Sequence, residues 1–149
     1  MTLQQRCEQF HSLHQPNNPL VLYNIWDAAS AKTIEAAGAQ ALATGSWSVA
    51  GAQGYADGEA LPLDFLIQLV ERIVASVSLP LSVDFEGGYA VAPDAVAENV
   101  AKLIAVGVVG VNLEDQRIGE GSLYSLEEQT RRLAAIRAEA DRSSEKWFI

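Results

Sequence analysis

The segments "AGAQALAT" (residues 37–44) and "VGVVGVNL" (residues 106–113) echo each other and decide the fold. In each, a glycine marks the expected end of a helix, and small and branched apolar residues typical of a buried strand follow it. Similar apolar runs occupy residues 19–25 and 79–85. Repeated units of helix and strand predict a parallel sheet that is covered by helices.

The stretches between the apolar runs carry apolar residues at helical spacing. Helical spacing reappears after Pro62, Pro93 stands where the first turn of a helix tolerates proline, and Ser125 with Glu128 forms a candidate capping box. The polar, glycine-rich stretch 45–59 is expected to be a loop. We expect helices over residues 28–37, 63–77, 93–104 and 126–140, and strands over residues 19–25, 39–44, 79–85 and 108–114, with a fifth strand opening at 146–149.

The length of 149 residues bears on how such a sheet is arranged. A closed (β/α)8 barrel usually needs about 250 residues, whereas an open doubly wound sheet suits a shorter chain. The open sheet would carry a glycine loop for phosphate after its first strand, and "NIWDAASA" (residues 24–31) contains no glycine. We therefore predict an α/β fold, a parallel TIM-type barrel truncated after about five strands, with residues 1–149 forming a single partial domain.

Composition excludes several classes of partner. The net charge of −9 disfavours nucleic acids and anionic membranes. No apolar run approaches the roughly 20 residues that span a bilayer, and residues 1–14 lack the apolar region of a signal peptide. Cys7 is the single cysteine, so no internal disulfide forms. We expect a cytoplasmic protein.

Acidic residues gather where two predicted strands end. The third strand ends in Asp84 and Glu86, which alternate onto one face, and the fourth strand ends in Glu114. Three converging carboxylates repel one another, and a divalent cation removes that conflict. Oxygen ligands suit Mg²⁺ or Mn²⁺ better than zinc. The alternative is that Asp84 and Glu86 are solvated turn or capping residues before Pro93.

The stretch "TGSWS" (residues 44–48) follows the second strand at the same predicted edge. Successive backbone N–H groups in such a segment can cradle a carboxylate or a phosphate, although many loops of this composition bind nothing. Trp47 can line a pocket or pack in the interior, and packing is the simpler interpretation.

Four motifs together resemble the isocitrate lyase/phosphoenolpyruvate mutase superfamily. The resemblance implies a (β/α)8 barrel that makes or breaks C–C or P–C bonds next to a carboxylate with the help of Mg²⁺, in a homo-oligomer of full-length chains. The motifs are "YNIWDAASA" (23–31), "ATGSWSVAGAQGYADGE" (43–59), "LPLSVDFEGGYA" (79–90) and "GVVGVNLEDQ" (107–116).

The resemblance also implies roles for individual residues. It places the metal on Asp84, Glu86 and Glu114. Substrate carboxylate and carbonyl oxygens would be received by Gly45, Ser46 and Trp47, and Asp57 would orient water or assist proton transfer. The implied chemistry is the stabilisation of an enolate of a pyruvate-like group.

The sequence departs from the lyases of the family in one loop. Isocitrate and methylisocitrate lyases carry a cysteine in a K-K/R-C-G-H loop, where this chain reads "QRIGEGSLYS" (residues 116–125). Their general acid is therefore missing, Cys7 does not replace it, and isocitrate cleavage is not expected. Glu86 also stands where aspartate is commoner, so its carboxylate lies one methylene further from the backbone.

The resulting expectation is a Mg²⁺-dependent lyase or mutase-like enzyme that acts on a small α-keto or α-hydroxy carboxylate. The alternative is a non-catalytic or degenerate member that binds a carboxylate or serves in assembly, or an inactive fragment. An open-sheet domain of the response-regulator type is disfavoured, because its acidic pair would follow the first strand, where only Asp27 stands.

Overall fold

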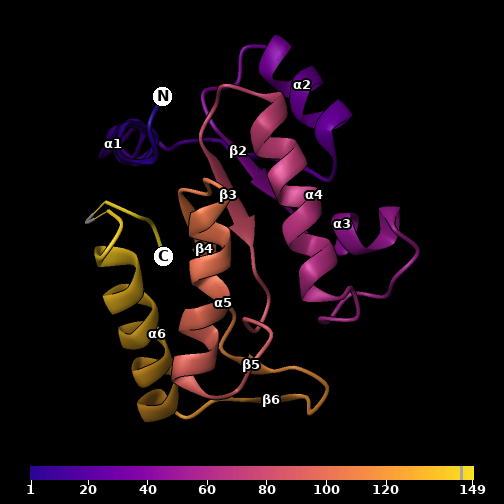
Figure 1. Ribbon diagram of the computed structural model, residues 1–149, viewed down its shortest axis with the longest axis vertical. Coiled ribbons are helices and arrows are strands. Elements are labelled where there is room, and N and C mark those ends of the chain that lie inside the picture. The colour runs from indigo at the N-terminus through magenta and orange to yellow at the C-terminus, as the bar shows by residue number, and fades with distance from the viewer. Residues whose placement is uncertain (145) are drawn as a thin grey trace.

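The computed structural model describes residues 1–144 and 146–149 and shows an α/β fold in which four parallel strands alternate with helices (Figure 1). A separate two-stranded hairpin follows the fourth strand. The elements, in chain order, are α1 (Leu3–Leu13), β1 (Tyr23–Ile25), α2 (Ala28–Ala36), β2 (Leu42–Thr44), α3 (Ser46–Ala52), α4 (Leu63–Ser76), β3 (Leu81–Asp84), α5 (Pro93–Ala105), β4 (Gly110–Asn112), β5 (Gln116–Arg117), β6 (Ser122–Leu123) and α6 (Leu126–Asp141).

The strand order β1-β2-β3-β4 confirms the barrel-type arrangement that the sequence predicted in preference to an open doubly wound sheet. Each strand pairs with the next one along the chain, as in the wall of a barrel, whereas a doubly wound sheet reverses its order at a switch point. The register pairs Ile25 with Thr44 and Asp84 with Asn112, so the strands end at a common edge. Side chains that follow the strands are thereby brought to the same rim.

The core lies between the strands and the helices that cover them. Leu42, Leu81 and Val83 of the sheet are at most 1% exposed and pack with Val70 of α4. Each such side chain contributes about 1.5–3 kcal/mol when it is fully buried. No helix in the described part of the chain combines the length and the apolar composition that a membrane crossing requires.

The helices expected over 28–37, 63–77, 93–104 and 126–140 are confirmed as α2, α4, α5 and α6. The capping box is confirmed as well: the Ser125 hydroxyl accepts the Glu128 N–H at 3.2 Å, and the Glu128 carboxylate accepts the Ser125 N–H at 3.0 Å. The strands are shorter than expected. The fifth strand is reduced to one parallel bridge between Phe148 and Gly110.

Two expectations were wrong. The stretch 45–59 is not all loop, because α3 forms directly after Gly45, which occupies the N-cap position of that helix. The run 19–25 is not buried on both faces: its strand has three residues, and the side chain of Tyr23 is 55% exposed. β1 is the edge strand of the described sheet, and of its three residues only Ile25 is buried.

The hairpin β5–β6 was not anticipated from the sequence. It folds back through a turn in which Gly119 and Gly121 adopt φ angles of 80° and 67°, a backbone conformation that glycine adopts without strain. The hairpin lies within the segment "QRIGEGSLYS" (residues 116–125).

Candidate functional site

Backbone pairing continues beyond β3 and β4 and brings Glu86 and Glu114 to one level. The Phe85 N–H donates to the Asn112 carbonyl at 3.1 Å, and the Glu114 N–H donates to the Glu86 carbonyl at 2.8 Å. Asp84 is the last residue of β3. The three carboxylates singled out in the sequence therefore follow adjacent strand ends at the same edge of the sheet.

Asp84 connects the end of β3 with the start of α3. Its Oδ2 atom accepts the Ser46 N–H at 2.9 Å, and its own N–H donates to the Thr44 hydroxyl at 3.0 Å. The structure thus brings a candidate metal ligand into contact with the candidate substrate loop. The Ser46 N–H that the family resemblance assigns to a substrate oxygen is bound here to Asp84.

The start of α3 is shaped by a close approach to β1. A Cβ atom at Gly45 would lie 2.8 Å from the Asn24 amide nitrogen and 3.2 Å from the Ser48 hydroxyl, so the position favours glycine. Trp47 is 75% exposed, and the interpretation that it packs in the interior is therefore wrong. Its ring is free to contact a bound molecule.

Glu86 is buried, with only 5% of its surface exposed, so it is not the solvated turn residue of the alternative interpretation. Its Oε2 atom accepts the Glu59 N–H at 2.6 Å, and its Oε1 atom accepts the Tyr89 hydroxyl at 3.3 Å. Burial raises the pKa of the Glu86 carboxyl, the Glu59 N–H partly opposes this, and the charge of Asp57 raises the pKa further. Asp57 itself is exposed.

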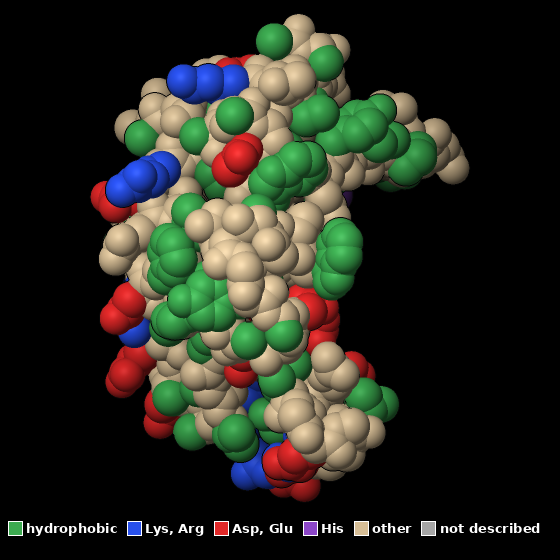
Figure 2. Space-filling model, turned by 90° about the vertical axis from the view of Figure 1, so that its right-hand side faces the viewer, with side chains coloured by type: hydrophobic (Ala, Val, Ile, Leu, Met, Phe, Trp, Pro, Cys, Tyr) green, Lys and Arg blue, Asp and Glu red, His purple; other side chains and the backbone are tan. Residues whose placement is uncertain are grey.

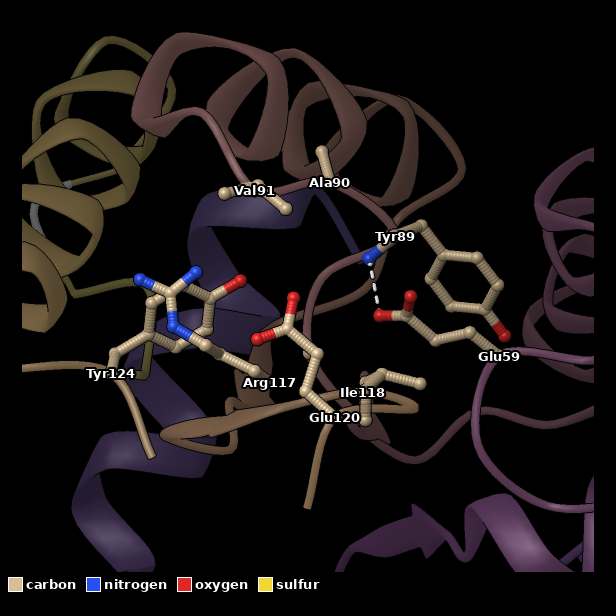
Figure 3. Close-up of a pocket in the computed structure, with 9 residues that line it drawn as sticks. Glu59, Tyr89, Ala90, Val91, Arg117, Ile118, Glu120 and Tyr124 are labelled. Carbon is tan, nitrogen blue, oxygen red and sulfur yellow. Dashed lines mark hydrogen bonds between the residues drawn. The ribbon is translucent and has the colours of Figure 1, made fainter. Parts of the chain in front are cut away.

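Glu59 is the second acid of this region, and the sequence did not point to it. Its Oε1 atom accepts the Tyr89 N–H at 2.7 Å, a bond drawn in Figure 3. Burial raises the pKa of the Glu59 carboxyl, while the Tyr89 N–H and the Arg132 charge oppose that change. Glu59 and Tyr89 line a pocket of about 150 Å³ between the β3–α5 loop and the hairpin (Figure 3).

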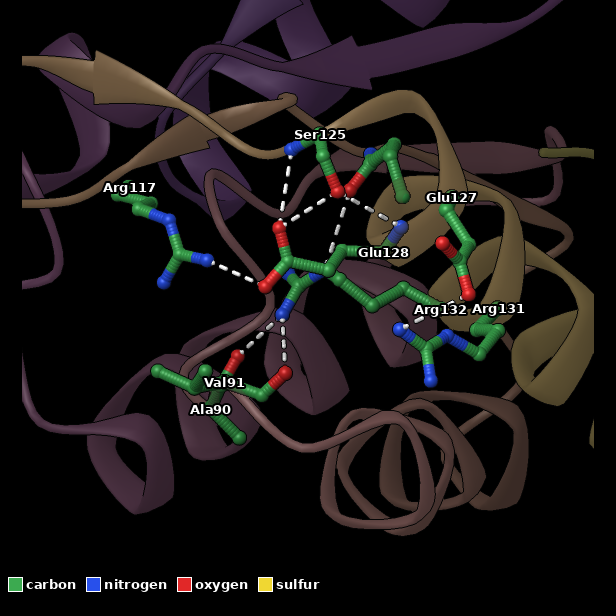
Figure 4. Close-up of polar contacts among 9 residues, drawn as sticks. Ala90, Val91, Arg117, Ser125, Glu127, Glu128, Arg131 and Arg132 are labelled. Atoms are coloured by element: carbon green, nitrogen blue, oxygen red, sulfur yellow. Dashed lines mark hydrogen bonds and ion pairs between the residues drawn. The ribbon is translucent and has the colours of Figure 1, made fainter.

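Arg132 was also missed, because its position in α6 reads as an ordinary helix position. Its side chain is buried and reaches back to the β3–α5 loop, where it donates to the carbonyls of Ala90 at 2.7 Å, Val91 at 2.8 Å and Gly87 (Figure 4). Its guanidinium lies 4.1 Å from the centre of the Tyr124 ring. The Arg132 guanidinium therefore holds the β3–α5 loop, which follows the strand end that carries Asp84 and Glu86.

Glu114 remains partly exposed at the fourth strand end. Its Oε2 atom accepts the Gln116 side-chain amide at 2.7 Å. Within residues 1–144 and 146–149, no three His, Cys, Asp or Glu side chains converge closely enough to hold an ion. Asp84, Glu86 and Glu114 share one edge without forming such a group.

The donor chemistry at this edge nevertheless fits a hard divalent cation. The available ligands are carboxylate oxygens, which Mg²⁺ and Mn²⁺ prefer. Asp84, Glu86 and Glu114 take part in none of the ion pairs among the described residues. Figure 2 shows acidic side chains beside a hollow of the molecular surface.

Comparison with known proteins identifies relatives over almost the whole chain. The sequence model described as phosphoenolpyruvate phosphomutase matches residues 10–149. The chain is 29% identical over 154 aligned residues to 2-methylisocitrate lyase from Escherichia coli K12, and it covers 52% of that protein.

Solved structures agree with the sequence relatives. A putative phosphonomutase from Burkholderia cenocepacia J2315 is 47% identical and superposes with a TM-score of 0.91 over 93% of this chain and 56% of its own. Phosphonopyruvate hydrolase in complex with oxalate and Mg²⁺ shares the fold, with 20% identity, a TM-score of 0.88 and coverage of 99% of this chain and 50% of its own. The chain spans about half the length of these relatives.

Proposed function

Since this chain belongs to the phosphoenolpyruvate mutase/isocitrate lyase superfamily, we propose that it is the N-terminal portion of a lyase or mutase-like enzyme. The proposed enzyme makes or breaks a C–C or P–C bond in a small α-keto or α-hydroxy carboxylate. Residues 1–149 form one partial barrel domain in this proposal, and the full-length form is a cytoplasmic homo-oligomer.

The observation that carries the proposal is the contact between Asp84 and the Ser46 N–H, at 2.9 Å. It joins the candidate metal ligands to the candidate substrate loop at the rim where parallel α/β enzymes bind their ligands. The relatives support the same conclusion, because one is a lyase of a substituted isocitrate and another binds oxalate and Mg²⁺.

The metal in this proposal is Mg²⁺, with Mn²⁺ as a substitute, and Asp84, Glu86 and Glu114 would hold it directly or through water. When bound, the ion supplies positive charge that stabilises an enolate. The chain itself binds the substrate oxygens at Gly45, Ser46 and Trp47. Asp57, exposed and close enough to raise the pKa of the Glu86 carboxyl, orients water or moves a proton.

Cleavage of isocitrate is not part of the proposal. The hairpin segment contains no cysteine, and Cys7 lies in α1 with none of its surface exposed. Burial also raises the pKa of the Cys7 thiol, which makes it a poor source of a thiolate near neutral pH.

A second candidate function is that of a degenerate member, which binds a carboxylate without turnover or serves in assembly. It is favoured by the segment 116–125, which contains no cysteine. An inactive fragment belongs to this alternative, because the chain covers about half of its relatives.

Product analysis tests the proposed function. The purified chain is incubated with oxaloacetate, phosphonopyruvate or a substituted malate, with and without Mg²⁺, and the products are followed by NMR. We expect Mg²⁺-dependent turnover that Asp84→Asn lowers by roughly 100-fold. The control Asp94→Asn, exposed in the first turn of α5, should stay close to wild type. Binding of oxalate without turnover would favour the non-catalytic alternative.

A further inference from the structure

Three residues around the acidic strand end share an unusual backbone conformation. The φ angles of Glu59, Glu86 and Tyr89 are 60°, 50° and 57°, in the left-handed region that side chains other than glycine seldom adopt. Glu59 lies in the loop after α3, whereas Glu86 and Tyr89 lie in the loop after β3. Two separate loops therefore adopt the same strained conformation where they meet.

The side chains of these residues link them in a closed cycle. The Glu59 N–H donates to Glu86 Oε2 at 2.6 Å, and the Tyr89 N–H donates to Glu59 Oε1 at 2.7 Å. The Tyr89 hydroxyl donates to Glu86 Oε1 at 3.3 Å and completes the cycle. Each member thus holds another member, and two of the three bonds join the two loops.

Glu59 is the member that reaches both neighbours across the loop boundary. Its backbone holds the Glu86 carboxylate, and its side chain holds the Tyr89 backbone. A Cβ atom at Gly87 would lie 2.9 Å from Glu59 Oε1, so the glycine permits this close approach. Asp57, the candidate catalytic acid, stands two residues before Glu59 in the same loop.

We propose that Glu59 is a positioning residue, which sets the loop of Asp57 against the loop of Glu86 through this hydrogen-bonded cycle. The inference deepens the proposed function and rests on it for the roles of Asp57 and Glu86. Glu59 itself contacts the Glu86 carboxylate only through its backbone N–H, so it acts on the candidate metal ligand indirectly.

Amide hydrogen exchange of the full chain tests the cycle without any ligand. Glu59→Met removes the acceptor of the Tyr89 N–H, whereas Glu59→Gln keeps an acceptor oxygen in the same place. The matched control is Glu98→Met, an exposed acid of α5. Protection factors are compared for the Glu59 and Tyr89 amides, with the Ala43 amide of β2 as the reporter of global unfolding.

In Glu59→Met we expect protection of both amides to fall about tenfold, which corresponds to the loss of one net hydrogen bond. The decisive amide is that of Glu59, because its own acceptor, Glu86, is untouched by the substitution. Glu59→Gln should restore protection to within about threefold, and Glu98→Met should change neither amide. Unchanged protection of the Glu59 amide in Glu59→Met would overturn the proposal.

Tyr89→Phe keeps the test decisive should the methionine variant fail to fold. This substitution removes only the hydroxyl that closes the cycle, and it too should lower the protection factor of the Glu59 amide. An unchanged protection factor would count against the cycle.

Calorimetric titration with Mg²⁺ then separates this inference from the proposed function. We expect Glu59→Met to weaken binding about tenfold, with recovery in Glu59→Gln. If wild-type protein binds no Mg²⁺, the proposed metal role fails, and amide exchange alone decides whether Glu59 positions the two loops.

Discussion

Glu128 and Glu86 are both glutamates, but their surroundings shift the pKa of the carboxyl in opposite directions. At the start of α6, Glu128 accepts hydrogen bonds from the Ser125 N–H and hydroxyl and pairs with Arg117 at 2.6 Å. These bonds, those from Ser125 above all, lower the pKa of Glu128 to about 2. In the β3–α5 loop, burial raises the pKa of the Glu86 carboxyl, which has no cationic partner among the described ion pairs.

The difference shows which carboxylate serves the fold. The charge of Glu128 is stabilised by hydrogen bonds from Ser125 and by the ion pair with Arg117, and its carboxylate caps the start of α6. Glu86 is buried, is held in a left-handed backbone at φ 50° and lies near other acids. Such a backbone costs about 1–2 kcal/mol, and strain of this kind clusters at functional sites. The arrangement around Glu86 therefore supports the proposal that this carboxylate takes part in binding.

Arg132 supports the strained region, and its removal should have the largest effect. Arg132→Met leaves the carbonyls of Gly87, Ala90 and Val91 without their donor, so we expect a loss of about 3 kcal/mol in the free energy of unfolding by urea denaturation. Arg131→Met, whose side chain is 62% exposed, should change it by less than about 0.5 kcal/mol. Equal effects of the two variants would show that the loop does not depend on the buried guanidinium.

Glu86→Gln sharpens the comparison through pH. The folded-state pKa of Glu86 lies above its usual value of 4.5, so its contribution to stability is complete below pH 4.5 and is lost as pH rises through the raised pKa. Without divalent ions, we expect the melting temperature of wild type to fall over this window more steeply than that of Glu86→Gln. If the melting temperatures of the two proteins changed with pH in parallel, the claim that Glu86 becomes a buried charge without a cationic partner would be contradicted.

Glu128→Gln should show the opposite sign and the smallest effect. The pKa of Glu128 is lowered from 4.5 to about 2, so its stabilisation is present above pH 4.5 and is lost as pH falls toward about 2. The variant should melt below wild type at pH 7 and converge with it near pH 2. The effect should also shrink with added salt, because exposed charges are screened. If the difference in melting temperature between wild type and Glu128→Gln grew as the pH fell, the contrast between Glu128 and Glu86 would be wrong.

The features that the sequence predicted are those set by local patterns. The helices, the capping box at Ser125 and the placement of Asp84 and Glu114 at strand ends follow from spacing and alternation over a few residues. Arg132 could not be found this way, because its partners in the β3–α5 loop lie 41 to 45 residues away. Glu59 likewise acts on Glu86 across 27 residues, and nothing in its local sequence signals a left-handed backbone.

The apolar run 19–25 has a similar explanation. It predicts burial, yet Val21, which precedes β1, and Tyr23, in β1, are 62% and 55% exposed. A run of apolar residues shows that a segment suits a covered sheet, but the elements that pack against its faces decide which side chains are buried. That packing is a property of the whole chain, which local patterns do not contain.

Thermal unfolding with increasing Mg²⁺ at pH 8 tests most directly whether the acidic edge holds a cation. If Mg²⁺ binds the folded protein alone, a concentration about 100 times the Kd stabilises it by about 2.7 kcal/mol. We predict that the melting temperature of wild type rises accordingly and that Glu86→Gln loses most of the rise. No rise for wild type at millimolar Mg²⁺, or an equal rise in the variant, would contradict the account.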